Sequence, residues 1–221
     1  MKNQLVFLML FLFFISACST EDLISEFGDS MITAKSKIGE VLNTAKSDFA
    51  QDAKLASIYG FNVNAKGQID LLKPTENTFV YVVQSDSEDT NEFYVPVYKT
   101  YPVKSPINFN TMLSFVKNAQ AQNILGSVFG RLSEINIETS IPYDDSPAVI
   151  AKMLARNEVS TFRATNSGSK IDMFLLPSKS IDTTSITNAA DWIVNFYGDT
   201  SSLVLWLHPG TADGTIDVIS N

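Results

Sequence analysis

The pattern of apolar and polar positions predicts where helices and strands lie along the chain. Residues 5–15 form an unbroken apolar run, which is shorter than the roughly 20 residues that a membrane-spanning helix needs. Residues 31–52 carry apolar side chains at three- and four-residue steps, which predicts an amphipathic helix capped by Asp29 or Ser30. Short runs rich in β-branched and aromatic residues, bounded by turn residues, then predict strands at 55–59, 68–72, 78–84 and 92–99.

A comparable order of elements appears in the second half. Ser146 as a cap and Pro147 at the first helical position predict a helix that extends to Leu154. Between the halves, residues 110–133 carry apolar side chains at helical steps, which predicts one broken helix or two short ones. Strands are expected at 159–165, 170–176, 191–197 and 202–208, with a turn at 166–168.

These elements together predict an α+β fold. Two repeated units, 31–105 and 140–221, would each consist of a helix and a four-stranded antiparallel sheet, and a helical connector at 106–139 would join them. Chance similarity between apolar strands of equal length is the competing explanation for the repeat.

Composition narrows the classes of partner. The chain carries a formal net charge of −8. Removal of residues 1–17 takes away only Lys2 among the charged side chains, leaving 15 basic against 24 acidic residues and a charge of −9. This balance argues against nucleic acid and against anionic lipid headgroups as partners, since both require clustered Lys and Arg.

The amino terminus predicts export. Lys2, the apolar run and the small residues Ser16 and Ala17 before Cys18 have the order of a secretion signal. Residues 15–18 resemble the lipobox of bacterial lipoproteins, in which the signal is cut before the cysteine and that cysteine is acylated. The resemblance implies a signal peptide at 1–17, a lipid anchor carrying palmitate-like chains at Cys18 and a tether at 18–30. An incidental cysteine after an ordinary signal is the alternative.

The residues after Cys18 bear on location. In the lipoprotein sorting pathway that this segment resembles, aspartate directly after the cysteine retains a protein in the inner membrane, so Ser19 implies the outer membrane. Glu21 and Asp22 resemble a surface-export signal as well, but we favour a solvated tether as their explanation. Cys18 is the chain's single cysteine, so no intrachain disulfide forms.

The C-terminal segments are similar to PepSY-type domains. The similarity lies in the aromatic-led run at 192–197, the following strand at 203–207 and the Gly-Thr-rich end at 210–216. It covers 143–219 and, more faintly, 31–100, and His208 with Pro209 stand where the family has an acidic residue. The resemblance implies tandem modules that bind or inhibit a protein or peptide of the envelope without chemistry of their own.

Candidate chemistry is sparse. His208 is the single histidine and ends an apolar run, so we interpret it as a partly buried, hydrogen-bonded residue. The acidic segment 86–92 lacks the glycine of a calcium loop and is interpreted as a solvated hairpin loop. Pro96 places the strand at 92–99 at a sheet edge or bulge. We assign no catalytic residue, metal or cofactor.

Three classes of function remain open. A membrane-anchored, noncatalytic binding or inhibitory module is favoured. A structural subunit of an outer-membrane assembly and an envelope hydrolase that uses His208 or a pair of carboxylates are the alternatives.

Replacing Cys18 with Ala is expected to abolish membrane attachment, because the acyl chains have no other thiol to occupy. Fractionation of cells that express each form measures this. Equal amounts of both forms in the membrane fraction would contradict the lipoprotein prediction.

Overall fold

The structure is a computed structural model in which Ile32–Asn221 form one compact unit. The predicted signal 1–17, Cys18 and most of the connector 106–139 lie outside the described residues. The residues that the structure describes are 30–87, 92–96, 103–104, 122, 126, 136–178, 189–211 and 213–219.

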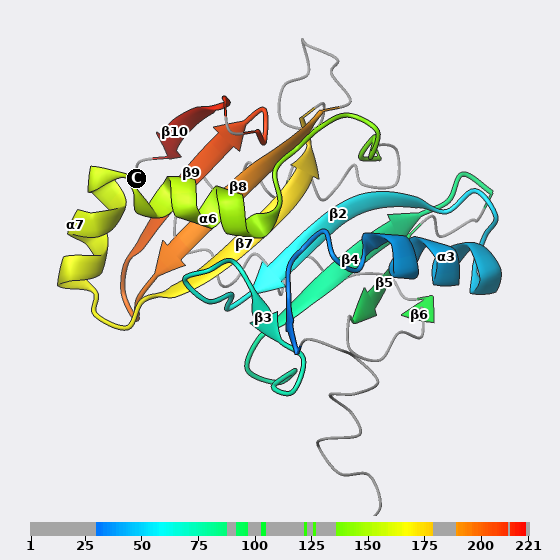
Figure 1. Ribbon diagram of the computed structural model, residues 1–221, viewed down its shortest axis with the longest axis horizontal. Coiled ribbons are helices and arrows are strands. Elements are labelled where there is room, and N and C mark those ends of the chain that lie inside the picture. The colour runs from blue at the N-terminus through cyan, green and yellow to red at the C-terminus, as the bar shows by residue number, and fades with distance from the viewer. Residues whose placement is uncertain are drawn as a thin grey trace, which may run out of the picture. The chain divides into compact units, whose positions relative to one another are not determined.

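Helices and antiparallel strands make up this part of the chain (Figure 1). The helices with described bounds are α3 (Ile38–Asp48), α6 (Ser146–Leu154) and α7 (Asn157–Thr165). The larger sheet contains β2 (Lys54–Phe61), β4 (Thr78–Gln84), β5 (Glu92–Pro96), β6 (Val103–Lys104), β7 (Lys170–Pro177), β8 (Ala190–Tyr197), β9 (Ser202–His208) and β10 (Thr215–Ile219). The short strands β1 (Met31–Ile32) and β3 (Ile69–Asp70) form a separate pair.

The eight strands follow the order β10-β9-β8-β7-β2-β4-β5-β6, and every neighbouring pair is antiparallel. The mixed α and β character and the antiparallel sheet are confirmed. The strands predicted for the two halves share one sheet, because β2 pairs with β7. At this junction Tyr59 lies opposite Phe174, and their rings stack with centroids 4.7 Å apart.

One face of the sheet packs against the helices. Residues directly opposite each other in neighbouring strands point to the same face, so the sheet register places Tyr81, Ile58, Leu175 and Trp192 together. The Tyr81 hydroxyl donates to the Ala34 carbonyl at 2.8 Å, close to the start of α3. Figure 1 shows α3 and α6 crossing the same side of the sheet. We call this side the helix face and the other side the opposite face.

The start of α6 binds the segment that precedes α3. The Asp145 carboxylate caps α6 by accepting from the Ser146 amide at 2.7 Å, so Asp145, and not the predicted Ser146, is the cap. The same carboxylate accepts from the Thr33 hydroxyl at 2.6 Å and from the Lys35 amide at 2.9 Å. The Ala34 amide donates to the Ser146 hydroxyl at 2.9 Å. We call these contacts the Asp145 clasp.

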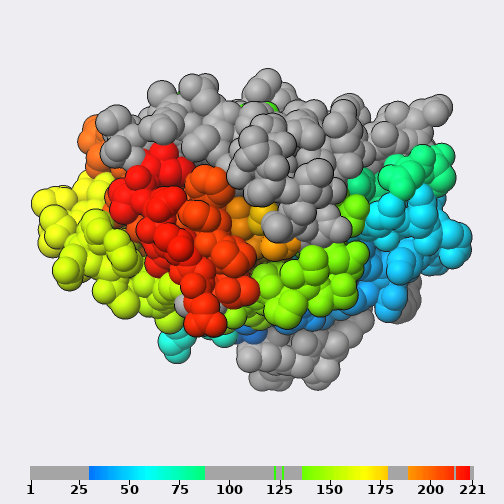
Figure 2. Space-filling view, turned by 90° about the horizontal axis from the view of Figure 1, so that it is seen from above, coloured from blue at the N-terminus to red at the C-terminus, as the bar shows by residue number. Residues whose placement is uncertain are grey.

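The segment before α6 and the helix itself also contact the C-terminal strands. The Asp144 amide donates to the Gly210 carbonyl at 2.6 Å, and the Lys152 ammonium donates to the Gly214 carbonyl at 2.8 Å. Figure 2 shows β9 and β10, in orange and red, beside α6 and the residues before it, in green. Helix α6 and the residue before the clasp therefore connect the clasp to the segment between β9 and β10.

The clasp explains why the first helix starts later than predicted. Residues 34–37 form turns instead of helix. The Thr33 hydroxyl and the amides of Ala34 and Lys35 bind the side chains of Asp145 and Ser146, which holds this segment out of the helix. The helix begins at Ile38 with Lys37 at its cap position and no side-chain cap. The predicted start at residue 31 and the cap at Asp29 or Ser30 are wrong.

The predicted strand at 159–165 is also wrong, because these residues belong to α7. Its β-branched side chains favour a strand locally, yet Val159 is buried and the rest of the segment is mostly exposed, which suits one side of a surface helix. Glu158 lies in the first turn, and the Asn166 amide closes the last turn on the Phe162 carbonyl at 2.9 Å.

The strand predicted at 68–72 does not enter the large sheet. The Asn64 side chain accepts from the Lys66 amide at 2.8 Å, and Gly67 adopts a positive φ of 71°. A Cβ atom at Gly67 would lie 2.4 Å from the Ser146 carbonyl oxygen, so the loop packs closely on the start of α6. Because this loop stays outside the large sheet, β2 pairs directly with β4. Strand β6 is then the fourth strand of the N-terminal half.

The sheet edge or bulge predicted for the strand that contains Pro96 is not found, because β5 pairs with both β4 and β6 and its described register has no shift. Strand β5 lies between β4 and β6, and Pro96 is its last residue, opposite Val80. Because β6 pairs only with Phe93 and Tyr94, the proline lies beyond the residues whose amides serve that ladder. The described strand covers Glu92–Pro96, and residues 97–99 of the predicted strand lie outside the described residues.

Replacing Asp145 with Ala is expected to lower the free energy of unfolding by about 2 kcal/mol, because the helix cap and the bonds to Thr33 and Lys35 are lost together. Urea unfolding measures this. Asp144→Ala is the matched control, since the described contacts of Asp144 are made by its backbone, and its effect should stay within about 0.5 kcal/mol. Equal losses in both variants would contradict the clasp.

Candidate functional site

A cleft of about 330 Å³ lies where α3, the beginning of β2 and residues 136–139 meet. This volume is at the lower end of the range for small-ligand sites. We call it the β2-end cleft. Its lining residues are Leu42, Lys46, Ala53, Lys54, Leu55, Asn136, Ile137, Glu138 and Thr139.

The cleft forms where the pairing between β2 and β7 stops. The described register covers Ile58 to Gly60 of β2, and β7 ends at Pro177, which has no amide hydrogen to continue the ladder. Beyond this point the Leu55 carbonyl accepts from the Ile137 amide at 2.7 Å. A single chain segment therefore replaces a strand beside the start of β2, and the space next to α3 remains open.

The cleft has an apolar floor and a polar rim. Ala53, Leu55 and Ile137 are 4, 1 and 2% exposed, so these buried residues lie at its base. Two ammonium groups, an amide, a carboxylate and a hydroxyl stand at its opening, on Lys46, Lys54, Asn136, Glu138 and Thr139. Such a combination suits a small ligand with an apolar body and one or two polar groups.

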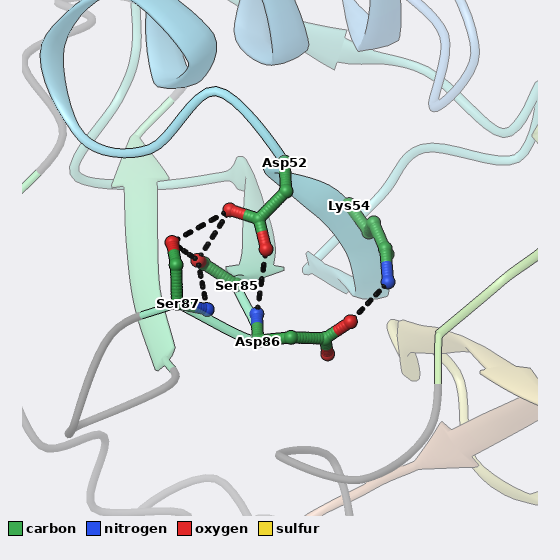
Figure 3. Close-up of polar contacts among 5 residues, drawn as sticks. All are labelled: Asp52, Lys54, Ser85, Asp86 and Ser87. Atoms are coloured by element: carbon green, nitrogen blue, oxygen red, sulfur yellow. Dashed lines mark hydrogen bonds and ion pairs between the residues drawn. The ribbon is translucent and has the colours of Figure 1, made fainter.

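A hydrogen-bonded cluster next to the cleft positions Lys54 (Figure 3). The Asp52 carboxylate accepts from the hydroxyls of Ser85 at 2.6 Å and Ser87 at 2.9 Å, and from the Asp86 amide at 3.0 Å. The Ser85 bond, followed by the Ser87 bond, lowers the pKa of Asp52 to about 2. Asp86 in turn accepts from the Lys54 ammonium at 2.6 Å. The cluster connects the start of β2 to the turn after β4.

The acidic segment predicted as a hairpin loop lies between β4 and β5. Of this segment the structure describes Asp86, Ser87 and, in β5, Glu92, whereas residues 88–91 lie outside the described part. No cluster of three or more His, Cys, Asp or Glu side chains that could hold a metal ion occurs among the described residues.

A buried carboxylate lies at the junction of the two halves, on the opposite face. Asp172 of β7 accepts from the Tyr59 hydroxyl at 3.1 Å, from the Asn62 amide at 2.8 Å and from the Tyr197 hydroxyl at 3.4 Å. Burial raises the pKa of Asp172 to about 6, and the hydrogen bonds only partly oppose this. Burial, followed by the nearby Asp172 charge, raises the pKa of both tyrosines. The group holds β2, β7 and β8 together.

His208 is half-buried and hydrogen-bonded, as predicted. Its Nε2 lies 2.9 Å from an Asp217 carboxylate oxygen across the β9–β10 pair, and its ring contacts Trp206 with centroids 4.6 Å apart. The nearby buried Asp191 accepts from the Trp206 indole nitrogen and from the Ser178 hydroxyl. Because the Ser178 hydroxyl bonds a carboxylate, this arrangement is not a serine–histidine nucleophile pair.

The sequence did not identify the cleft or the two buried aspartates. A signal for the aspartates exists, since Asp172 and Asp191 are acidic residues within strongly apolar strands. The cleft has no such signal, because its lining comes from three separate stretches of the chain. Cys18, the predicted lipidation site, lies outside the described residues.

Comparison with known proteins identifies no family for this chain. The chain matches no protein-family model, no curated protein and no solved structure. Within the described ranges, no helix has the length and hydropathy required to cross a bilayer.

The raised pKa of Asp172 predicts a pH-dependent stability. The Asp172 carboxyl binds its proton more tightly in the folded protein than in the unfolded chain. The contribution of the protonated Asp172 to the free energy of unfolding is therefore complete below pH 3.8 and is lost as the pH rises through about 6. Relative to Asp172→Asn, the wild type should lose about 3 kcal/mol of unfolding free energy across this window. Urea unfolding at several pH values between 4 and about 7 measures the difference, with the exposed Asp48→Asn as control. A constant difference would contradict the prediction.

Proposed function

We propose that this protein is an exported, lipid-anchored binding module that holds a small ligand in the β2-end cleft without transforming it. The observation that carries the proposal is the cleft itself, which is lined by the buried apolar residues Ala53, Leu55 and Ile137 and by several polar side chains. An open, small and partly apolar cavity is typical of a ligand site.

The chemistry of the rim favours retention over reaction. The Lys54 ammonium is paired with Asp86, and the Glu138 carboxylate accepts from the Ser140 hydroxyl at 2.9 Å. A general acid or base needs a proton-transfer partner in the site and a pKa matched to the reaction. The rim residues instead offer fixed charges and hydrogen-bonding groups, which orient a ligand.

The proposed location follows from the amino terminus. Acylation of Cys18 would attach the protein to the envelope membrane, and Ser19 favours the outer membrane. The tether at 18–30 would then separate the folded unit from the lipid surface. The natural ligand in this setting would be an envelope peptide or another small envelope compound.

We also propose that the two halves are copies of one PepSY-like unit. Each half places a helix before four strands of the sheet, and the first of these strands in each half, β2 and β7, pair antiparallel at the centre. Tyr59 and Phe174 face each other at this pair. An antiparallel central pair with three further strands on each side is the arrangement expected of a duplicated unit related by an approximate twofold axis.

Ligand capture tests the proposed function. Purified protein is mixed with the peptide and small-molecule fraction of the native envelope, and bound compounds are identified by mass spectrometry after release. Leu42→Phe should reduce the retained ligand about tenfold or more, because the larger ring occupies the cleft. The ligand should leave with its mass unchanged.

Leu72→Phe is the matched control, since Leu72 is 41% exposed and does not line the cleft. It should retain as much ligand as the wild type. Equal retention by the wild type and Leu42→Phe, or release of a chemically altered compound, would contradict a noncatalytic binding cleft.

A further inference from the structure

We infer that the β2-end cleft selects an apolar group that carries a carboxylate, such as a small hydrophobic acid or the C-terminal residue of a peptide. This inference rests on the proposed function and names the ligand class of the same site. It is carried by the charges at the rim, by the partners those charges already have, and by the size of the cavity.

The rim carries two cations in an acidic protein. Lys46 and Lys54 line the opening together with the carboxylate of Glu138. Lys54 already pairs with Asp86 at 2.6 Å, so Lys46 is the cation that remains available to a ligand. A pair of ammonium groups at the mouth of an apolar cavity attracts an anion, and the low-dielectric floor beneath it strengthens the attraction.

Lys46 is the unoccupied cation of the pair. It lies in the last turn of α3, and within the described part of the chain its ammonium has no acidic partner. Lys54 pairs with Asp86, but the Asp86 side chain is 67% exposed, and exposed ion pairs contribute little. A ligand carboxylate between Lys46 and Lys54 therefore gains one cation fully and competes with Asp86 for the other.

Glu138 contributes the one carboxylate among the described lining residues, and its described hydrogen bonds come from Ser140. One of its oxygens accepts from both the amide and the hydroxyl of Ser140, which holds the carboxylate in the turn that follows the cleft. The Asn136 side chain and the Thr139 hydroxyl remain at the rim as hydrogen-bonding groups. They supply donors that a carboxylate accepts.

The apolar residues that line the cleft indicate the second feature of the ligand, an apolar body. Leu42, Ala53, Leu55 and Ile137 line the cleft, and its volume of about 330 Å³ accommodates a branched aliphatic side chain with a short stretch of backbone. An anion without an apolar body would leave this floor unfilled. The inferred ligand therefore combines both features.

Binding of N-acetyl-leucine and of its uncharged analogue N-acetyl-leucinamide tests the inference by calorimetry or NMR titration. The acid should bind about tenfold more tightly than the amide, and Lys46→Gln should weaken acid binding about five- to tenfold without changing amide binding. The exposed Lys66→Gln controls for the loss of one positive charge elsewhere and should bind like the wild type.

Two sources of the carboxylate are distinguished by N-acetyl-glycyl-glycyl-leucine. Tighter binding of this peptide than of N-acetyl-leucine supports a peptide C-terminus, and weaker binding supports a free small acid. Equal binding of acid and amide, or an unchanged affinity in Lys46→Gln, would overturn the inference. Retention of an uncharged envelope ligand would overturn the inference alone and leave the proposed function standing.

Discussion

The pairing of β2 with β7 is the contact on which the rest of this structure depends. It joins four strands on each side into one antiparallel sheet, although its described register contains only three residue pairs, centred on Tyr59 and Phe174. Side chains supplement this short ladder, since the Ser57 hydroxyl donates to the Leu175 carbonyl and the Tyr59 hydroxyl donates to Asp172. The Asp145 clasp adds a second connection, between the segment before α3 and the start of α6.

The short register has two consequences. Strand β7 ends at Pro177, so the beginning of β2 has no strand partner on that side. Its Leu55 carbonyl accepts from the Ile137 amide instead, and the candidate cleft opens beside this contact. The buried carboxylate of Asp172 also lies at this junction, where its hydrogen bonds reach both neighbouring strands. A buried acid costs stability when it is charged, yet its three hydrogen bonds connect β7 to β2, to the residue that follows β2, and to β8. The same junction thus produces both the site and a pH-sensitive contact.

Much of the fold could be predicted, and the errors have identifiable causes. Strands β4, β8 and β9 and helix α6 lie where the apolar pattern and turn residues placed them, because local sequence and buried environment agree there. The segment that became α7 was misjudged because β-branched residues favour strands locally, whereas burial of Val159 alone suits a surface helix. The predicted strand at 68–72 and the early start of α3 failed because contacts with Ser146 and Asp145, more than 70 residues away, decide those conformations.

By itself the sequence determined the α+β class, the acidic charge, the predicted export signal with Cys18 and the position of most elements, since these depend on local periodicity and composition. Only the tertiary structure decided that both sets of strands form one sheet, that Asp172 is buried between them, and that Lys46, Lys54 and residues 136–139 meet around a cleft. The physical reason is that strand pairing and cavity formation join residues far apart in the chain, and the pattern along any one segment contains no information about its partner.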